Sequence, residues 1–166
     1  MVVFPYLTAL LRYGTEEWKC VRLTHKIHGH VGIYSILGAK MGIYARERLG
    51  TPLSVVSFAG HTPPVSCLND GLQMGARATL GHGNIKVAPS DRQEVKARFQ
   101  GPEKSLTLQL KPQYAAQVEA DIRHGVEQYG HTPPYWKYVR KLALKYWSQW
   151  DREEIFEEIV SCPPDA

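Results

Sequence analysis

Two histidines and a cysteine have the side chains that most often bind metal ions. His28 and His30 lie on either side of Gly29, and Cys67 follows a loop with two consecutive prolines. Gly29 permits a tight turn, so both imidazoles could point toward one ion. Cys67 is the obvious partner for this histidine cluster, and His61 is a further candidate ligand after an expected strand. The alternative for each histidine is a hydrogen-bonded position in the core or on the surface, the commoner role of a single histidine.

The segment around Cys67 predicts a helix with a thiol at its start. Pro63 and Pro64 favour an extended chain. Ser66 is a suitable N-cap, which would put Cys67 at the first helical position. Free backbone N–H groups and the positive end of the helix dipole would favour the thiolate over the thiol there. The helix should end at Gly81, because glycine readily adopts the positive φ angles of a C-cap.

Asp70 is the candidate catalytic residue of this helix. Its carboxylate could act as a general base beside a metal-bound water, or it could orient a ligand. The alternative is purely structural, because an acid in the first turn stabilises a helix by about 0.3 to 1 kcal/mol. Weaker candidates to line the site are Lys26, Tyr34, Asn69, Gln73, His82, Asn84 and His131.

These segments together resemble a known family. The residues that carry the resemblance are His28-Gly29-His30, Gly38, Met41, Gly42, Leu49-Gly50, Cys67, Asp70, Gln73, Thr79, Gly81, Gly83 and Asn84. In this pattern the chain resembles the formylmethanofuran dehydrogenase E-subunit family, over roughly residues 20 to 110. Many members follow His-Gly-His with Cys-Pro-Gly, where this chain has Val31-Gly32-Ile33-Tyr34. Many also carry a Cys-rich C-terminal zinc finger, where this chain has only Cys162.

The resemblance implies a thioredoxin-like α+β core and a metal site. His28, His30 and Cys67 would be the ligands, and such a mixed imidazole and thiolate set favours zinc or another late divalent metal. Some relatives are associated with molybdenum or tungsten formylmethanofuran dehydrogenase of methanogenesis. An accessory role in that one-carbon chemistry is therefore expected. The alternative is a non-catalytic module that holds a small ligand or a metal for sensing or delivery, and whether the chain is an enzyme stays open.

Composition predicts a single globular domain, 1–166, with a helical extension from about residue 131. The 166 residues are 43% hydrophobic and 22% charged, which is ordinary for a folded domain. Three widely spaced cysteines form no disulfide framework or Cys-x-x-Cys pair, which favours a reducing cytoplasm and excludes thioredoxin-like catalysis. Neither a signal peptide nor an apolar run long enough to span a bilayer is present. We therefore expect a cytoplasmic protein that is not bound to membranes.

Periodicity predicts an α+β fold with a mixed sheet of about five strands flanked by helices. Expected strands are a buried run at 53–58, a short one at 85–87, and a hairpin of 95–99 with 106–110. Expected helices are 6–27 with a break at Gly14, 32–49, 112–130, 135–150 and an acidic one within 151–160. Glycines four apart in 32–49 should let another backbone approach closely.

The aromatic and basic helix at 135–150 raises the question of partners. Its aromatic residues lie on more than one side, which favours packing between the core and a second protomer, so a homodimer is expected. The alternative is single-stranded nucleic acid. The net charge of +4 is dispersed, and the basic cluster of 137–145 is followed at once by acidic residues, so nucleic-acid binding is disfavoured.

Overall fold

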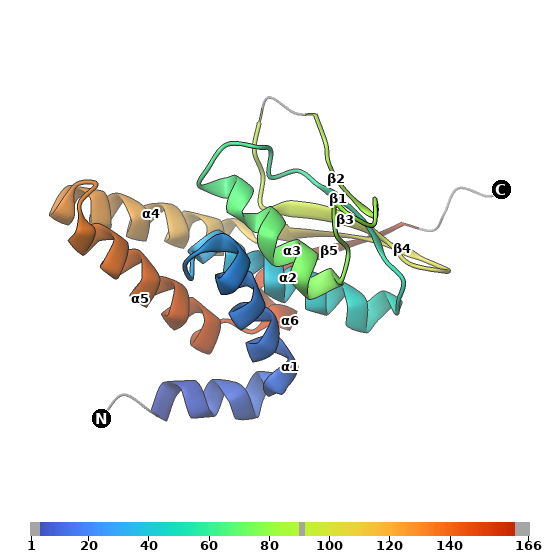
Figure 1. Cartoon of the computed structure of the whole chain (residues 1–166), viewed down its shortest axis with the longest axis horizontal. Helices are drawn as coiled ribbons and strands as arrows, with labels where there is room; N and C mark the ends of the chain where they lie inside the picture. The colour runs from blue at the N-terminus through green and yellow to red at the C-terminus, as the bar shows by residue number, and fades with distance from the viewer. Residues whose placement is uncertain (1–3, 90–91, 162–166) are drawn as a thin grey trace.

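The structure, a computed structural model, describes residues 4–89 and 92–161 (Figure 1). Helices and strands follow one another in this order: α1 Phe4–His28, α2 Ile33–Leu49, β1 Ser54–Ser57, the short 3-10 helix η1 Val65–Cys67, α3 Leu68–Ala76, β2 Ile85–Val87, β3 Lys96–Gln100, β4 Ser105–Leu110, α4 Pro112–Tyr129, α5 Pro133–Gln149, α6 Arg152–Ile155 and β5 Phe156–Ser161. Gly14 interrupts α1 with a φ of 79°, as the sequence predicted.

The strands form one mixed sheet in the order β2-β1-β3-β4-β5. β1 pairs parallel with β2 and antiparallel with β3, and the remaining neighbours are antiparallel. The α+β class, the five-stranded mixed sheet and the hairpin of β3 with β4 are therefore confirmed. The thioredoxin-like detail stays a prediction, as does the single domain with an extension from about 131.

The predicted acidic helix at 151–160 is wrong for most of its length. Asp151 does cap a helix, since its carboxylate accepts a hydrogen bond from the Glu153 amide, but that helix, α6, ends at Ile155. The chain then continues as β5 along the edge of β4, with Phe156 opposite Leu110. Backbone groups at an open sheet edge need partners, and this pairing satisfies them better than an exposed helix would.

Helix α2 is the central helix of the fold. It packs against α1, α3, α5 and β4, and its residues from Ile33 to Ala45 are buried except Tyr34, which is half-buried. Gly38 and Gly42 face Gly71 and Gly75 of α3, so the two backbones touch. A Cβ atom built on Gly71 would lie 2.0 Å from the carbonyl oxygen of Ser35. The predicted close approach along this glycine stripe is confirmed.

Helix α3 is shorter than the sequence predicted. Ser66 lies inside η1, and Cys67 occupies the N-cap of α3 with no side-chain cap hydrogen bond. The helix ends at Ala76, where Arg77 takes a left-handed conformation with a φ of 56°, so Gly81 is not its C-cap. The next turn is held instead by side chains. Asn84 Oδ1 accepts from the Thr79 amide at 2.7 Å, which is a bond that a continuing helix would not allow.

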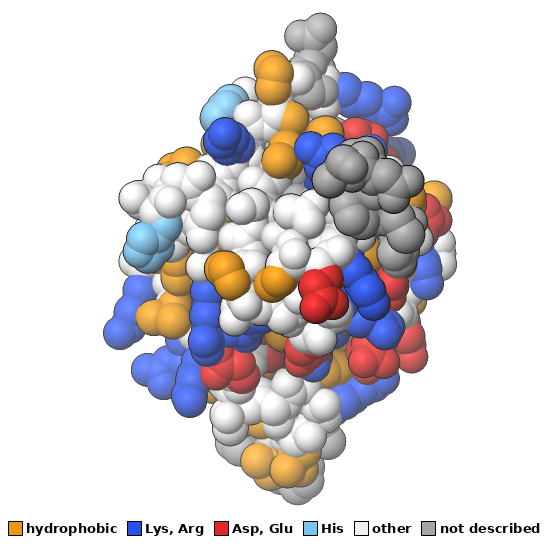
Figure 2. All heavy atoms as spheres, turned by 90° about the vertical axis from the view of Figure 1, so that its right-hand side faces the viewer, with side chains coloured by type: hydrophobic (Ala, Val, Ile, Leu, Met, Phe, Trp, Pro, Cys, Tyr) orange, Lys and Arg blue, Asp and Glu red, His pale blue; other side chains and the backbone are white. Residues whose placement is uncertain are grey.

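Surface charge and helix composition bear on the expected partners. Basic and acidic side chains both occur on the face that Figure 2 shows. Within the described part of the chain, no helix is both long and apolar enough to cross a bilayer. The aromatic side chains of α5 that suggested a second protomer are largely buried by the chain itself, among them Tyr146 and Trp147. The homodimer stays a prediction.

Candidate metal and ligand site

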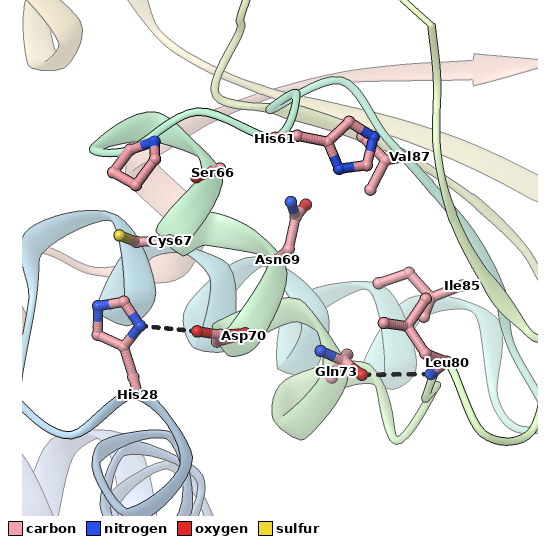
Figure 3. Close-up of a pocket in the computed structure, with 11 residues that line it drawn as sticks. His28, His61, Ser66, Cys67, Asn69, Asp70, Gln73, Leu80, Ile85 and Val87 are labelled. Atoms are coloured by element: carbon pink, nitrogen blue, oxygen red, sulfur yellow. Dashed lines mark hydrogen bonds and ion pairs between the residues drawn. The ribbon is translucent and has the colours of Figure 1, made fainter.

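A cavity of about 350 Å³ opens beside α3 and collects most of the candidate residues (Figure 3). Its lining residues are His28, His61, Pro63, Ser66, Cys67, Asn69, Asp70, Gln73, Leu80, Ile85 and Val87. They come from the end of α1, the loop after β1, η1 with α3, the turn after α3, and the edge strand β2. The cavity thus lies where the loop after a strand leads into the start of a helix, a common place for ligands in proteins that combine strands with helices.

His28 and Asp70 form the best-defined pair in the cavity. Asp70 Oδ2 lies 2.7 Å from His28 Nδ1, although the two residues are 42 positions apart in the sequence. A carboxylate at Nδ1 keeps the proton on that nitrogen, so the lone pair of the ring lies on Nε2. Nε2 of His28 is buried and has no hydrogen-bond partner among the described residues. This arrangement presents a free imidazole nitrogen to the interior of the site.

His30 brings a second imidazole to the same place. Its ring centroid lies 4.5 Å from that of His28. A Cβ atom built on Gly32 would lie 3.5 Å from Nε2 of His30 and 3.6 Å from Nε2 of His28. Both ring nitrogens therefore border the space beside Gly32. Burial, assisted by the neighbouring His28, lowers the pKa of His30, which favours the neutral form that can bind a metal.

Cys67 is half-buried and forms no disulfide. Its sulfur lies on the side of α3 that faces His28 (Figure 3). Burial raises the pKa of the Cys67 thiol, and the charge of Asp70 raises it further. The prediction of a favoured thiolate is therefore wrong for the protein as it stands, because loss of solvent and a nearby carboxylate outweigh the helix dipole.

His61 lies across the cavity from this cluster and is exposed. The loop that carries it is fixed by polar residues of neighbouring elements. Ser57 donates to Asn69 Oδ1 at 2.6 Å, and Asn69 donates to the carbonyl of Gly60 at 2.9 Å. Gln93 donates to the carbonyl of Thr62 at 2.6 Å. Sequence reasoning missed Ser57 and Gln93, because their partners are distant in the chain and neither residue belongs to a recognisable motif.

A second cavity of about 400 Å³ adjoins the first. The two share His28, Pro63 and Cys67, so these residues form a common wall. The other side of the second cavity is formed by α2, α4 and the start of α5, and it includes the predicted candidates Tyr34 and His131.

The remaining sequence candidates divide into two groups. Asn69 and Gln73 line the first cavity, as predicted. Lys26, His82 and Asn84 line neither of the two cavities. His82 and Asn84 instead form hydrogen bonds with Thr79 that hold the turn after α3.

The chemistry of this donor set fits a metal ion only in part. Among residues 4–89 and 92–161, no three or more His, Cys, Asp or Glu side chains are grouped so that they could hold a metal ion. Two neighbouring imidazoles, one of them hydrogen-bonded to a carboxylate, are nevertheless typical of metal-binding histidines. The pair can also accept a hydrogen bond from a small ligand. Fold and site together define an α+β protein with a histidine–carboxylate pair at the wall between two cavities.

Comparison with known families identifies the group to which this chain belongs. A family model described as "FmdE, Molybdenum formylmethanofuran dehydrogenase operon" matches residues 27–166. The chain is a member of the FmdE family, as the resemblance implied, and the match continues past residue 110 through the C-terminal helices. The comparison with curated proteins gave no match.

One solved structure shows the same fold. The chain is similar to the crystal structure of a tungsten formylmethanofuran dehydrogenase E-subunit (FmdE)-like protein from Syntrophus aciditrophicus, with a TM-score of 0.56. The similarity covers 89% of this chain and 73% of that one, at 16% sequence identity. At this identity the likeness concerns the fold alone.

Proposed function

We propose that this chain is a metal-binding member of the FmdE family, with His28, His30 and Cys67 as ligands of zinc or another late divalent metal. The observation that carries the proposal is Nε2 of His28, which is buried and unpartnered while Asp70 holds Nδ1 at 2.7 Å. A buried polar atom without a partner costs roughly 1 to 3 kcal/mol, and a metal ion would offset that cost. His61 is a further candidate ligand from the opposite wall.

Asp70 has a positioning role in this proposal. Its oxygen already accepts a hydrogen bond from Nδ1 of His28, which fixes the orientation of the ring. A bound zinc ion would supply a Lewis acid, with a coordination position left for water or substrate. The charge of a metal ion would also favour the Cys67 thiolate and reverse the raised pKa of that thiol.

Gly32 lies in the segment 31–34 that departs from the family pattern. Its φ of −109° and ψ of 157° are accessible to any residue, and its added Cβ would meet no atom closer than 3.4 Å. A cysteine there would therefore fit without strain and would begin between the two histidine Nε2 atoms. Gly32→Cys should raise the zinc affinity of the protein, because it adds a thiolate to the imidazole pair.

The test is elemental analysis of untagged protein after reconstitution with zinc. We expect about one equivalent in the parent. His28→Ala and Cys67→Ala should lose it, and Gly32→Cys should retain zinc against a chelator at least about tenfold better than the parent. His124→Ala, at an exposed histidine of α4, is the matched control and should keep the metal. A reconstituted parent without metal would overturn the proposal.

The alternative function is a non-catalytic module that binds a small ligand. The second cavity favours it, because a cavity of this size beside the histidines needs no metal to hold a ligand. A panel of esters, amides and phosphates separates the two functions. Turnover that is lost in Cys67→Ala and depends on added metal would establish an enzyme, and silence across the panel would favour the module.

The expected partners and location belong to the same proposal. The description of the family names the molybdenum formylmethanofuran dehydrogenase operon. This description supports an accessory role beside such a dehydrogenase in one-carbon metabolism. We expect that role in the cytoplasm. Failure to co-purify with dehydrogenase subunits from native cells would count against this role. Sedimentation tests the homodimer. The mass of a single chain, 18.8 kDa, at every protein concentration would rule the homodimer out.

A further inference from the structure

The second cavity differs in character from the first. Its walls away from the shared residues are apolar and aromatic, from Tyr34 of α2, Ile122 of α4, and Tyr135, Trp136 and Val139 of α5. None of the described residues that line it is acidic. Its polar groups are the imidazoles of His28, His30 and His131, together with the Tyr hydroxyls and the thiol of Cys67. The volume of about 400 Å³ lies within the range of small-molecule sites.

The rings at the start of α5 form a continuous aromatic surface. Tyr135 and Trp136 meet edge to face at 5.1 Å, and His131 meets Tyr135 in the same way at 5.4 Å. The ring of His30 lies 6.4 Å from Trp136, also edge to face. This surface therefore runs from the start of α5 to the imidazoles that border Gly32.

Trp136 is an exposed ring of that surface. It is 47% exposed, whereas Tyr135 beside it is 7% exposed. A large indole next to a cavity is stabilised when another apolar surface covers it, and aromatic partners add a contribution from ring geometry. A planar ring that enters the cavity would cover Trp136 and contact Val139 and Ile122.

We propose that the second cavity binds a small aromatic molecule whose oxygen-bearing substituent points at His28 and His30. This ligand class rests on the proposed function, since it places the oxygen atom where the metal would also lie. The aromatic ring would sit among Tyr34, Tyr135, Trp136 and Val139. None of the described lining residues is acidic, and a hydroxyl substituent can donate a hydrogen bond to Nε2 of His28, which is buried and has no partner among the described residues.

The test is calorimetric titration of metal-free, chelator-treated protein with 2-naphthol. Cyclohexanol is the matched probe, because it carries the same hydroxyl on a saturated, non-planar ring. We expect saturable binding of 2-naphthol that is at least about tenfold tighter than binding of cyclohexanol. Equal affinity for the two probes, or no binding of either, would overturn the proposal.

Two variants locate the binding. Trp136→Ala removes an exposed side chain and should weaken the binding of 2-naphthol about tenfold. Val139→Phe fills the cavity from α5 and should abolish binding. If the Val139→Phe protein does not fold, the result for Trp136→Ala is sufficient to test the location. Tyr129→Ala removes another exposed aromatic that lines neither cavity and should bind within about twofold of the parent. Parent-like affinity in Trp136→Ala would overturn the assignment to this cavity.

The metal content of the same preparations separates this proposal from the proposed function. Zinc in the reconstituted parent without 2-naphthol binding in the metal-free form overturns the ligand class and leaves the metal site standing. Binding of 2-naphthol to a parent that never takes up zinc overturns the metal site and supports the ligand class.

Discussion

The hydrogen bond between Asp70 and His28 decides what the site can do. A histidine without such a partner can turn its ring and carry its proton on either nitrogen. Here Nδ1 is hydrogen-bonded to the carboxylate, so that Nε2 remains as an acceptor in a buried position. Burial raises the pKa of the Cys67 thiol, and the same carboxylate raises it further. One acidic side chain therefore orients one candidate ligand and adds to the effect of burial on the other.

Tyr34 gives a prediction about pH at the residue scale. Burial, assisted by the charge of Glu119, raises the pKa of Tyr34 from 10.0 to about 12. Between these values the unfolded chain loses the phenol proton while the folded protein keeps it. The folded state therefore loses stability as the pH rises above 10, by about 2 kcal/mol near pH 11.5. Below pH 10 the phenol is protonated in both the folded and the unfolded state, so this loss is absent.

The Tyr34→Phe variant tests whether the phenol of Tyr34 makes the protein less stable as the pH rises. Urea unfolding at pH 9 and pH 11.5 should show that the variant loses about 2 kcal/mol less than the parent between the two values. Tyr129→Phe, at an exposed position, is the matched control and should lose as much as the parent. The same loss in parent and Tyr34→Phe would mean that the phenol of Tyr34 is solvated in the folded protein.

At the scale of elements, the contact between α2 and α3 sets the geometry of the site. Gly71 follows Asp70 directly and packs on the backbone of α2, so the position of the Asp70 carboxylate depends on how closely the two helices approach. The three atoms nearest to an added Cβ at Gly71 all belong to the α2 backbone, at 2.0 to 2.9 Å. Backbone atoms inside a helix cannot move aside as a side chain would.

Gly71→Ala should therefore force the two helices apart. We expect a loss of about 3 kcal/mol in the free energy of unfolding, measured by chemical denaturation. Gly81→Ala is the matched control, because an added Cβ there meets nothing within 4 Å, and it should change stability by less than about 1 kcal/mol. A Gly71→Ala protein as stable as the parent would show that the contact is looser than described.

The sequence predicted those elements whose own side chains carry the signal. The apolar run of β1 and the alternation of β3 and β4 identified strands, and the glycine spacing of α2 predicted the helix contact. The sequence did not predict β5, because this strand depends on its neighbour. The open edge of β4 supplies backbone partners, and no local pattern in 156–161 reveals them. Strand pairing of this kind is a property of the tertiary fold.

The sequence predicted which residues belong to the candidate site, but not how these residues interact. The spacing of His28 and His30 and the position of Cys67 identified residues that the fold does bring to one cavity wall. The hydrogen bond from His28 to Asp70 spans 42 positions, so no local pattern could reveal it. The raised pKa of the Cys67 thiol depends on burial, which the helix-dipole argument ignores.

At the scale of the whole molecule, a buried ion-pair network joins the first two helices of the chain to α6 near its C-terminal end. Glu17 of α1 lies 2.7 Å from Lys40 of α2 and 2.9 Å from Arg152 of α6. The side chains of Glu17 and Lys40 are fully buried, and the Lys40 ammonium also lies over the Tyr13 ring at 4.0 Å. Burial lowers the pKa of Lys40, and the carboxylate of Glu17 opposes that effect. The network holds α1, and with it His28 at its end, against the rest of the fold.

Glu17→Gln should cost much more stability than its position outside the cavities suggests. It keeps the shape of the side chain but leaves the buried Lys40 without a counter-charge, and breaking such a pair from one side costs about 3 to 5 kcal/mol. The neighbouring Glu16 is the matched control, because it pairs with Arg46 and Arg77 at the surface. Glu16→Gln should cost about 1 kcal/mol or less. Urea unfolding at pH 7 followed by circular dichroism measures both, and equal losses in the two variants would mean that water reaches Lys40 in the folded protein.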